Sequence, residues 1–326
     1  MVPFEERGNL SEKKLRILVI SAHPPIDSEL TSNWVKLGYQ VYLFSNTVKW
    51  EDQYNILDSA VVRGVPENQP DLIIAGHITD TFYAVYLKIK KRWFRSKLVM
   101  IHWWFPIRVP ILYLFKNISV CEYERRYLKK ILGISSGVAY CPVDTAFFRK
   151  TGDITNPSRI LVIGNGFKER KIMGYNHLIK IIDRIHLKHP EFSIVIMGNN
   201  KREDFPEYVS IINCNKDEMR SEINKSSVVF FTTTHNLIMN SLQIAMACER
   251  KVVAFDLEPF REVIKDGISG YLIPNFNENL FANTVIEAAL NSNIMVGKLA
   301  RESIVEKCES SKVSSLIISL ATNASK

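Results

Sequence analysis

Residues 226–274 read SSVVFFTTTHNLIMNSLQIAMACERKVVAFDLEPFREVIKDGISGYLIP, and this stretch decides the fold. It predicts an apolar strand from Val228 to Phe231, a polar loop, a small-residue helix from Ser241 to Cys248, a second strand from Lys251 to Phe255 and a glycine-marked turn. Strands that are apolar along their whole length are typical of parallel sheets buried on both faces. The order therefore predicts the ligand-binding edge of a doubly wound α/β domain.

The same alternation runs through both halves of the chain and predicts two such domains. The other strands expected are Arg16–Ser21, Gln40–Ser45, Asp71–Gly76, Leu98–Ile101, Ile118–Val120, Arg159–Ile163, Phe192–Met197, Val209–Ile212 and Tyr271–Ile273, with helices near Ser28–Leu37, Asp80–Arg92 and Glu122–Leu132. Residues 150–157 are polar and contain Gly and Pro, which is typical of a linker. We expect one domain at 1–155, a second at 156–302 and a helical tail at 303–326.

The composition is that of a globular protein, with 46% hydrophobic and 23% charged residues in a chain of 326. No apolar run reaches the ~18 residues of a membrane span, and the first residues are too polar for a signal peptide. We therefore expect a soluble, cytoplasmic protein. The five cysteines are scattered without a CxxC pair, which predicts free thiols rather than disulfides or a zinc site.

The positive charge lies almost entirely in the first half. Residues 1–150 contain 21 Lys and Arg against 14 Asp and Glu, whereas residues 151–326 contain 21 against 20. Much of the excess falls in residues 87–97, where six basic side chains surround Trp93 and Phe94. Such a segment suits peripheral contact with an anionic membrane, or is the solvated end of a helix whose aromatic rings belong to the core. No helix-turn-helix, finger or RNA-binding motif accompanies it, so we expect no nucleic-acid partner.

Several phrases resemble one known family, and they occur in that family's order. They are RILVISAHPP at 16–25, PDLIIAGH at 70–77, SVCEYE at 119–124, CPVDTAFF at 141–148, ILVIGNGFKERK at 160–171, and AMAC, VVAFD and DGISGYLIP within 245–274. The family comprises retaining glycosyltransferases of the GT-B fold, in its glycogen synthase-like and phosphatidylinositol mannosyltransferase-like group. The resemblance implies two Rossmann-like, doubly wound parallel-sheet domains that face each other across a cleft.

The resemblance also assigns a donor site for a nucleotide-diphosphate sugar. The family's phosphate-binding Lys falls on Lys171 or, with a one-residue gap, on Arg170, and its Arg falls on Asn165. The alternative for this KERK turn is a solvated charged turn. The other residues assigned to the donor are Gly164, Gly198, Asn236, Gln243 and Glu262. For Glu262 an exposed ion pair with Arg261 or Lys265 is the competing interpretation.

Two glutamates that the family places before its AMA phrase are replaced here by Asn236 and Ile244. The amide of Asn236 is suited to bind a sugar hydroxyl, whereas Ile244 has no group for a ribose. Gln243 takes that role only if the helix turns by one residue. Either the donor is held differently, or donor binding has been lost.

On the other domain, the resemblance places His102 beside the donor sugar, at the end of a strand. Trp103, Trp104 and Phe105 are suited either to stack on an acceptor or to pack against nearby prolines. His23 and Asp27 are further candidates for acceptor contact. The expected catalytic residues are thus His102, Lys171 and Asn236.

The function that follows is a glycosyltransferase, retaining and metal-independent, that uses a glycan, lipid-linked or other acceptor. No metal-binding motif occurs in the sequence, and no cofactor is expected beyond the donor substrate. A catalytically degenerate binding or partner subunit of the same fold is the alternative, because both glutamates are replaced.

Overall fold

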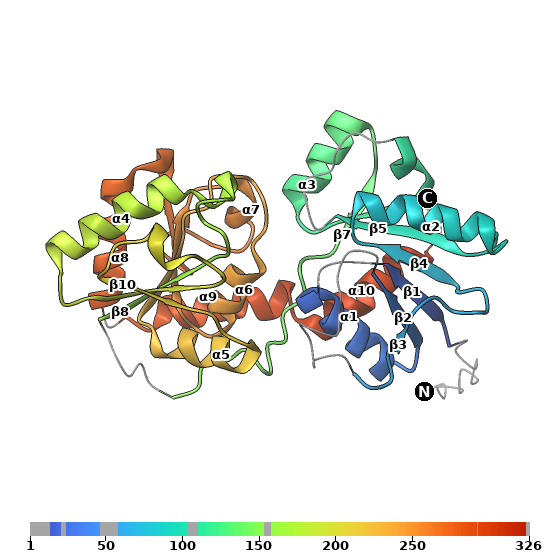
Figure 1. Cartoon of the computed structure of the whole chain (residues 1–326), viewed down its shortest axis with the longest axis horizontal. Coiled ribbons are helices and arrows are strands. Elements are labelled where there is room, and N and C mark those ends of the chain that lie inside the picture. Colours follow the sequence, from blue (N-terminus) through green and yellow to red (C-terminus); the bar gives the residue numbers. More distant parts are fainter. Residues whose placement is uncertain are drawn as a thin grey trace, which may run out of the picture. The chain divides into compact units, whose positions relative to one another are not determined.

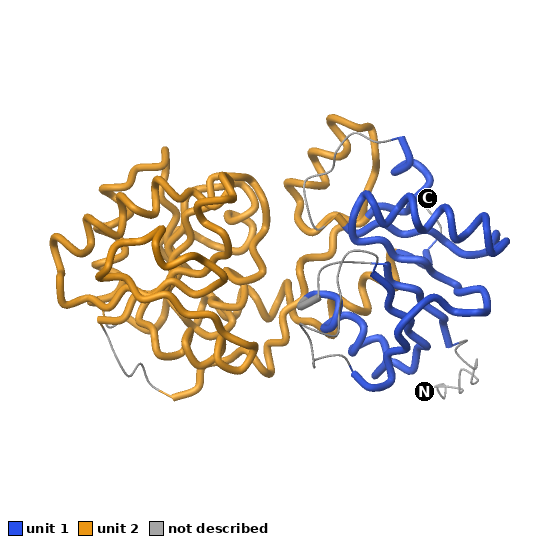
Figure 2. The backbone as a smooth tube through the Cα atoms, in the orientation of Figure 1, with its two compact units in different colours: residues 1–101, 107–117, 321–326 blue, residues 102–106, 118–320 orange. Residues whose placement is uncertain are grey.

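The computed structural model describes residues 14–20, 24–45, 58–102, 110–152, 158–291 and 293–323. Strands and helices alternate along the described chain (Figure 1). Two compact units are distinguished in Figure 2: unit 1 comprises residues 1–101, 107–117 and 321–326, and unit 2 comprises residues 102–106 and 118–320. The domain limits expected near residues 155 and 302 stay a prediction.

The first sheet has seven strands in the order β3-β2-β1-β4-β5-β6-β7. β1 pairs in parallel with both β2 and β4. Its residues Ile17, Leu18 and Ile20 are fully buried, which explains the continuous apolar run in the sequence. The strands are β1 (Arg16–Ile20), β2 (Gln40–Phe44), β3 (Val62–Arg63), β4 (Leu72–Ala75), β5 (Lys97–His102), β6 (Lys116–Ser119) and β7 (Ser136–Val138).

Helices connect these strands. Figure 1 shows α1 (Pro24–Lys36) and α2 (Ile78–Lys90) on opposite sides of the first sheet, as expected when the chain leaves β1 and β4 toward opposite sheet edges. The helix expected at Glu122–Leu132 is α3 (Glu122–Tyr127) followed by a π turn, η2 (Leu128–Leu132), and Gly133 ends it with φ 68°. The short helix η1 (Pro110–Leu114) precedes β6.

The second sheet has six strands in the order β10-β9-β8-β11-β12-β13. The strand order reverses between β8 and β11, and this is the switch point at which doubly wound sheets bind ligands. Its strands are β8 (Arg159–Ile163), β9 (Ser193–Met197), β10 (Val209–Ile212), β11 (Val228–Phe231), β12 (Lys251–Phe255) and β13 (Tyr271–Ile273). These bounds match the expected strands to within one residue.

The helices beside this sheet are α4 (Tyr175–Lys188), α5 (Lys216–Lys225), α6 (Asn240–Ala247), α7 (Glu258–Arg261), α8 (Glu278–Leu290) and α9 (Met295–Lys307). The last helix, α10 (Ser310–Thr322), lies instead beside the first sheet, where a Cβ at Gly137 of β7 would be 2.7 Å from the Leu320 side chain (Figure 1). Short turns are η3 (Lys171–Met173), η4 (Arg202–Asp204) and η5 (Pro274–Phe276). In α6 the small side chains are a packing requirement, since Ala245, Ala247 and Cys248 are fully buried. The fold expected from the sequence, two parallel-sheet α/β domains, is confirmed.

Within the described residues no helix is long and apolar enough to cross a membrane. All five cysteines are free thiols; Cys214 is half-buried and the other four are buried.

Candidate active site

Three hydrogen bonds from side chains join the loops at the carboxyl ends of β8 and β9, in addition to backbone bonds. The side-chain oxygen of Asn165 accepts from the amide of Asn199 (2.7 Å), and the amide of Asn200 donates to the carbonyl of Gly164 (2.7 Å). The Asn200 side-chain oxygen accepts from the amide of Phe167 (3.0 Å). Gly198 has φ 138°, and a Cβ there would lie 2.3 Å from the Gly164 carbonyl oxygen. Only glycine lets the two loops approach this closely.

The loop after β11 is bound to the turn that follows β8. The Thr232 hydroxyl donates to the carbonyl of Met173 (2.9 Å), and the Thr233 hydroxyl donates to that of Ile172 (2.8 Å). The backbone of Gly174, with φ 71°, passes so near that a Cβ would lie 2.0 Å from the Thr232 carbonyl oxygen. These contacts bring η3, which begins at Lys171, to the switch point between β8 and β11.

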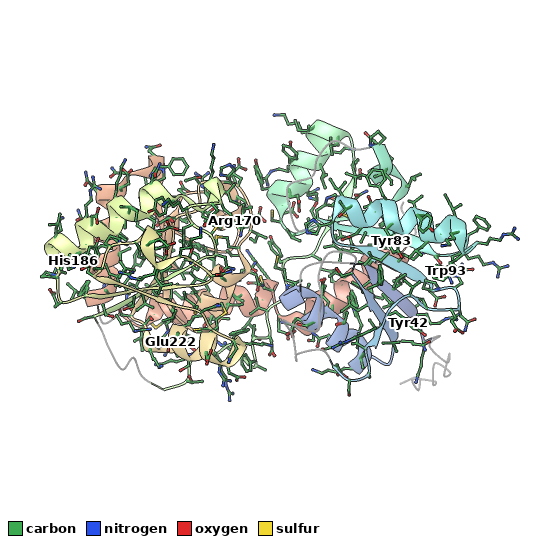
Figure 3. The ribbon with its side chains drawn as sticks, in the orientation of Figure 1. Tyr42, Tyr83, Trp93, Arg170, His186 and Glu222 are labelled. Atoms are coloured by element: carbon green, nitrogen blue, oxygen red, sulfur yellow. The ribbon has the colours of Figure 1, made fainter. Side chains whose placement is uncertain are left out.

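In the KERK turn, residues 168–171, the first two charged residues lie near partners of opposite charge. Lys168 pairs with Asp204 (2.7 Å), and Glu169 lies 3.9 Å from Lys201. Lys171 is exposed, and its ammonium group has no ion pair or hydrogen bond within the described residues. Arg170 is half-buried in the same turn and is labelled in Figure 3. The turn is therefore not uniformly solvated, and Lys171 keeps its charge available for an anion.

Helix α6 follows β11, which is the neighbour of β8 in the sheet, and the KERK turn follows β8. Its N-cap residue, Met239, provides no side-chain hydrogen bond to the first amides of the helix. Such an end attracts negative charge through its amides and through the helix dipole. Upstream, the Asn236 amide donates to the Tyr123 hydroxyl (3.4 Å), and its oxygen accepts from the amide of Glu258 (3.3 Å). Asn236 is half-buried and remains a candidate for a sugar hydroxyl.

The side chain of Gln243 lies in the core of unit 2 and is fully buried. Its amide donates to the sulfur of Cys308 (3.4 Å), and its oxygen has no partner within the described residues. This burial favours a structural role over contact with a ribose. The neighbouring Ile244 is 7% exposed and belongs to the hydrophobic core, as its apolar side chain requires.

Glu262 binds a helix end rather than an exposed cation. Its carboxylate accepts from the amides of Glu122 (2.8 Å) and Tyr123 (2.7 Å) and from the Tyr140 hydroxyl (3.0 Å). Burial, followed by the nearby Glu262 charge, raises the pKa of Tyr140 well above its usual value, so the phenol remains a donor. The guanidinium of Arg261 pairs with Asp256 instead (2.5 Å), so the expected pair with Arg261 is wrong. With three donors in place, Glu262 acts as a support for α3.

His102, the last residue of β5, is 1% exposed. Its place at the carboxyl end of a central strand is the one expected, and its role toward a donor sugar stays a prediction. Asp27 is buried in α1. His23, Trp103, Trp104 and Phe105 lie outside the described residues.

Asp80 was not identified from the sequence. It lies in the first turn of α2, directly after β4, and the switch point of the first sheet falls between β1 and β4. Its side chain is 4% exposed, and burial raises its pKa to about 6 although the backbone amides of His77 and Gly76 bond to it. An Asp three residues after a helix N-cap that follows a strand was the available signal.

The fold is the GT-B architecture, which is shared with solved glycosyltransferases. Residues 157–291 match the family described as Glycosyl transferases group 1. A comparison with curated proteins gave no significant match.

Solved structures share the fold over nearly the whole chain. A glycosyltransferase from Rickettsia africae is 14% identical and covers 96% of this chain and 100% of its own, with a TM-score of 0.75. HepE from Anabaena in complex with UDP-glucose is 15% identical, with coverages of 94% and 98% and a TM-score of 0.72. Sucrose-phosphate synthase from Thermosynechococcus elongatus is 14% identical, with coverages of 94% and 98% and a TM-score of 0.75.

Proposed function

We propose that this protein transfers a sugar from a nucleotide-diphosphate donor to a glycan, lipid-linked or other acceptor, with retention and without a metal ion. The observation that carries the proposal is the placement of Lys171, with its unpaired ammonium group among the described residues, at the switch point between β8 and β11. An exposed cation and the amides at the start of α6 match the charge of a departing diphosphate.

In the proposed mechanism the donor phosphate accepts the proton of the acceptor hydroxyl as that hydroxyl attacks the same face of the sugar. Lys171 and Arg170 stabilise the negative charge that grows on the leaving diphosphate. Asn236 binds a sugar hydroxyl, and His102 contacts the donor sugar from the end of β5. Positive groups of the chain thus replace a metal ion.

UDP is the first nucleotide to test, because HepE has been crystallised with UDP-glucose and with UDP. Calorimetric titration with UDP, GDP, ADP and TDP identifies the base. We expect micromolar binding of one of them, and Lys171→Ala should weaken it by about 1.5–3 kcal/mol, or ~10–150-fold.

Lys298→Ala is the matched control, since Lys298 is an exposed lysine on α9 of the same unit. Its affinity for the nucleotide should equal that of the native protein. Equal affinity of the native protein and the Lys171→Ala variant would refute the assigned role of Lys171. Proton NMR of the product formed by the native protein then reads the anomeric configuration, and an inverted product would refute retention.

A non-catalytic partner subunit is the second candidate, favoured by one observation: Ile244, at the position of a family glutamate, is part of the core. This candidate predicts that no sugar is released from any donor, whether or not a nucleotide binds. Turnover of a nucleotide sugar by the isolated chain would exclude it.

A further inference from the structure

Unit 1 exposes a group of large apolar side chains around the end of α2. Six of them are between 49% and 67% exposed: Phe82, Tyr86, Ile89, Phe94, Tyr113 and Leu114. We call these six residues, together with the basic residues among them, the α2 surface. Large exposed apolar groups on a soluble domain mark a place of contact when they gather on one surface.

Helix α2 is apolar on two sides. Ala84 and Leu87 are buried toward the sheet, whereas Phe82, Tyr86 and Ile89 recur at spacings of four and three on the exposed side. A helix that covers a sheet normally presents polar residues to water on that side. The outer face of α2 therefore has the composition of a surface that is covered in use.

The end of α2 separates Trp93 from Phe94. Arg92 adopts φ 55°, its amide bonds to the Ile89 carbonyl (3.1 Å) and the Trp93 amide bonds to the Lys88 carbonyl (2.9 Å), which is a Schellman turn. Trp93 is consequently 3% exposed and belongs to the core, whereas Phe94 is 67% exposed. Figure 3 labels Trp93 beside this turn. The prediction that the aromatic rings of this segment belong to the core is therefore confirmed for Trp93 and is wrong for Phe94.

The charge of this surface has one sign. The sequence from Thr81 to Cys121 contains no Asp or Glu, and in that span the described basic residues are Lys88, Lys90, Lys91, Arg92, Arg95, Lys97 and Lys116. Lys90, Lys91, Arg92 and Arg95 are exposed. The ammonium group of Lys90 lies 5.2 Å from the centre of the Tyr86 ring, so cations and aromatic rings are interleaved on the surface.

A pocket of about 660 Å³ opens within the same surface. Its lining includes the apolar side chains of Ile89, Phe94 and Leu114 and the basic side chains of Lys88, Lys97 and Lys116. Lys88 donates to the carbonyls of Phe94 and Ser96, and Lys97 donates to that of Thr322 (2.6 Å). These bonds hold two ammonium groups at the pocket, where an anionic head group meets them while apolar atoms enter beside Phe94 and Leu114.

We propose that the α2 surface binds an anionic phospholipid bilayer. Tyr and Phe rings match the depth of the interface, basic side chains pair with lipid phosphates, and the pocket takes one lipid head group with the start of its chains. An acidic protein partner would satisfy the charges, but exposed Phe94, Tyr113 and Leu114 around an all-basic rim fit a bilayer better. The proposal requires neither donor binding nor turnover, so it stands apart from the proposed function.

Co-sedimentation of the full chain with vesicles tests this binding. We expect binding to vesicles of 70% phosphatidylcholine and 30% phosphatidylglycerol, and little binding to pure phosphatidylcholine. Lys90→Glu/Lys91→Glu should weaken it by at least about 30-fold, since each basic residue near the surface contributes ~1 kcal/mol. The matched control is Lys188→Glu/Lys298→Glu, which changes the net charge equally at exposed lysines of unit 2 and should bind nearly as well as the native chain.

The apolar part is tested by Phe94→Ser, expected to weaken binding about 10-fold, with Phe94→Leu restoring most of it. Leu187→Ser, at an 81% exposed leucine of α4, should have no effect. Equal binding to both kinds of vesicle, or equal losses from the two lysine pairs, would overturn the proposal. Binding that needs the lysines but ignores Phe94→Ser would show adsorption by charge alone and would overturn it too, as would an absence of vesicle binding in a chain that still binds nucleotide.

Discussion

Asp80 is a carboxyl group with almost no access to solvent, and its pKa is raised to about 6 by that burial. The backbone amides of His77 and Gly76 bond to it and favour the charged form, yet desolvation outweighs them. The folded chain therefore holds this proton more tightly than the unfolded chain, whose Asp has an ordinary pKa near 3.8.

The pH dependence of stability follows from that difference. The stabilising contribution of the bound proton is complete below about pH 4 and is lost as the pH rises through about 6, because the folded-state pKa is the higher one. A shift of this size corresponds to about 2–3 kcal/mol. Asp80→Asn stays neutral at every pH. Its free energy of unfolding, relative to that of the native protein, should therefore be about 2 kcal/mol higher at pH 8 than at pH 4.5.

Urea denaturation at the two pH values measures this gain. Glu67→Gln, which neutralises an exposed carboxyl of the same unit, is the control and should show no such change. If the stability difference between Asp80→Asn and the native chain is the same at both pH values, Asp80 does not titrate near neutrality.

At the scale of an element, η3 is held against the loop after β11 by the close approach of Gly174. Gly174 and Gly267 have almost the same φ, 71° and 70°, but a Cβ meets the Thr232 carbonyl oxygen at 2.0 Å in the first case and open space in the second. The two glycines therefore separate backbone conformation from close approach.

Gly174→Ala should lower the free energy of unfolding by about 3–4 kcal/mol, because it combines left-handed strain with a clash that breaks the bonds of Thr232 and Thr233. Gly267→Ala should cost only the strain of about 1 kcal/mol. Denaturation of both variants, with nucleotide titration of each at a temperature where it is folded, measures the difference. If the two variants lose similar amounts of unfolding free energy, η3 can shift to accommodate the Cβ, and Gly174 does not position Lys171.

At the scale of the whole molecule, a ligand that binds only the folded chain raises its stability. UDP, or whichever nucleotide binds, present at 100 times its Kd should stabilise the chain by about 2.7 kcal/mol and raise the Tm by about 4 °C. If the positive groups of the chain replace a metal ion, the shift should be unchanged in EDTA. A shift that EDTA abolishes and Mg²⁺ or Mn²⁺ restores would contradict metal-independent binding.

Much of the sheet framework was predictable because buried parallel strands are apolar throughout. β8, β10 and β11 match their expected bounds residue for residue. β3, of two exposed residues, was not found, since a strand without a buried face leaves no apolar run. The site was predictable only in part: Lys171 stands out through a family phrase, but the locking role of Asn199 and Gly174 depends on backbone approach that no side-chain pattern records.

By itself the sequence determined two α/β domains, their parallel strands and the loop that contains Lys171. The reason is that strands buried on both faces appear as continuous apolar runs, and the loop lies in a phrase that resembles the family's. Only the tertiary structure decided which groups meet across long separations. In the tertiary structure Gln243 is buried, and Glu262 accepts hydrogen bonds from the first amides of α3. At the end of α2, Trp93 is buried and Phe94 is exposed. The physical reason is that hydrogen bonding and burial depend on neighbours in space, which residues far apart in sequence supply.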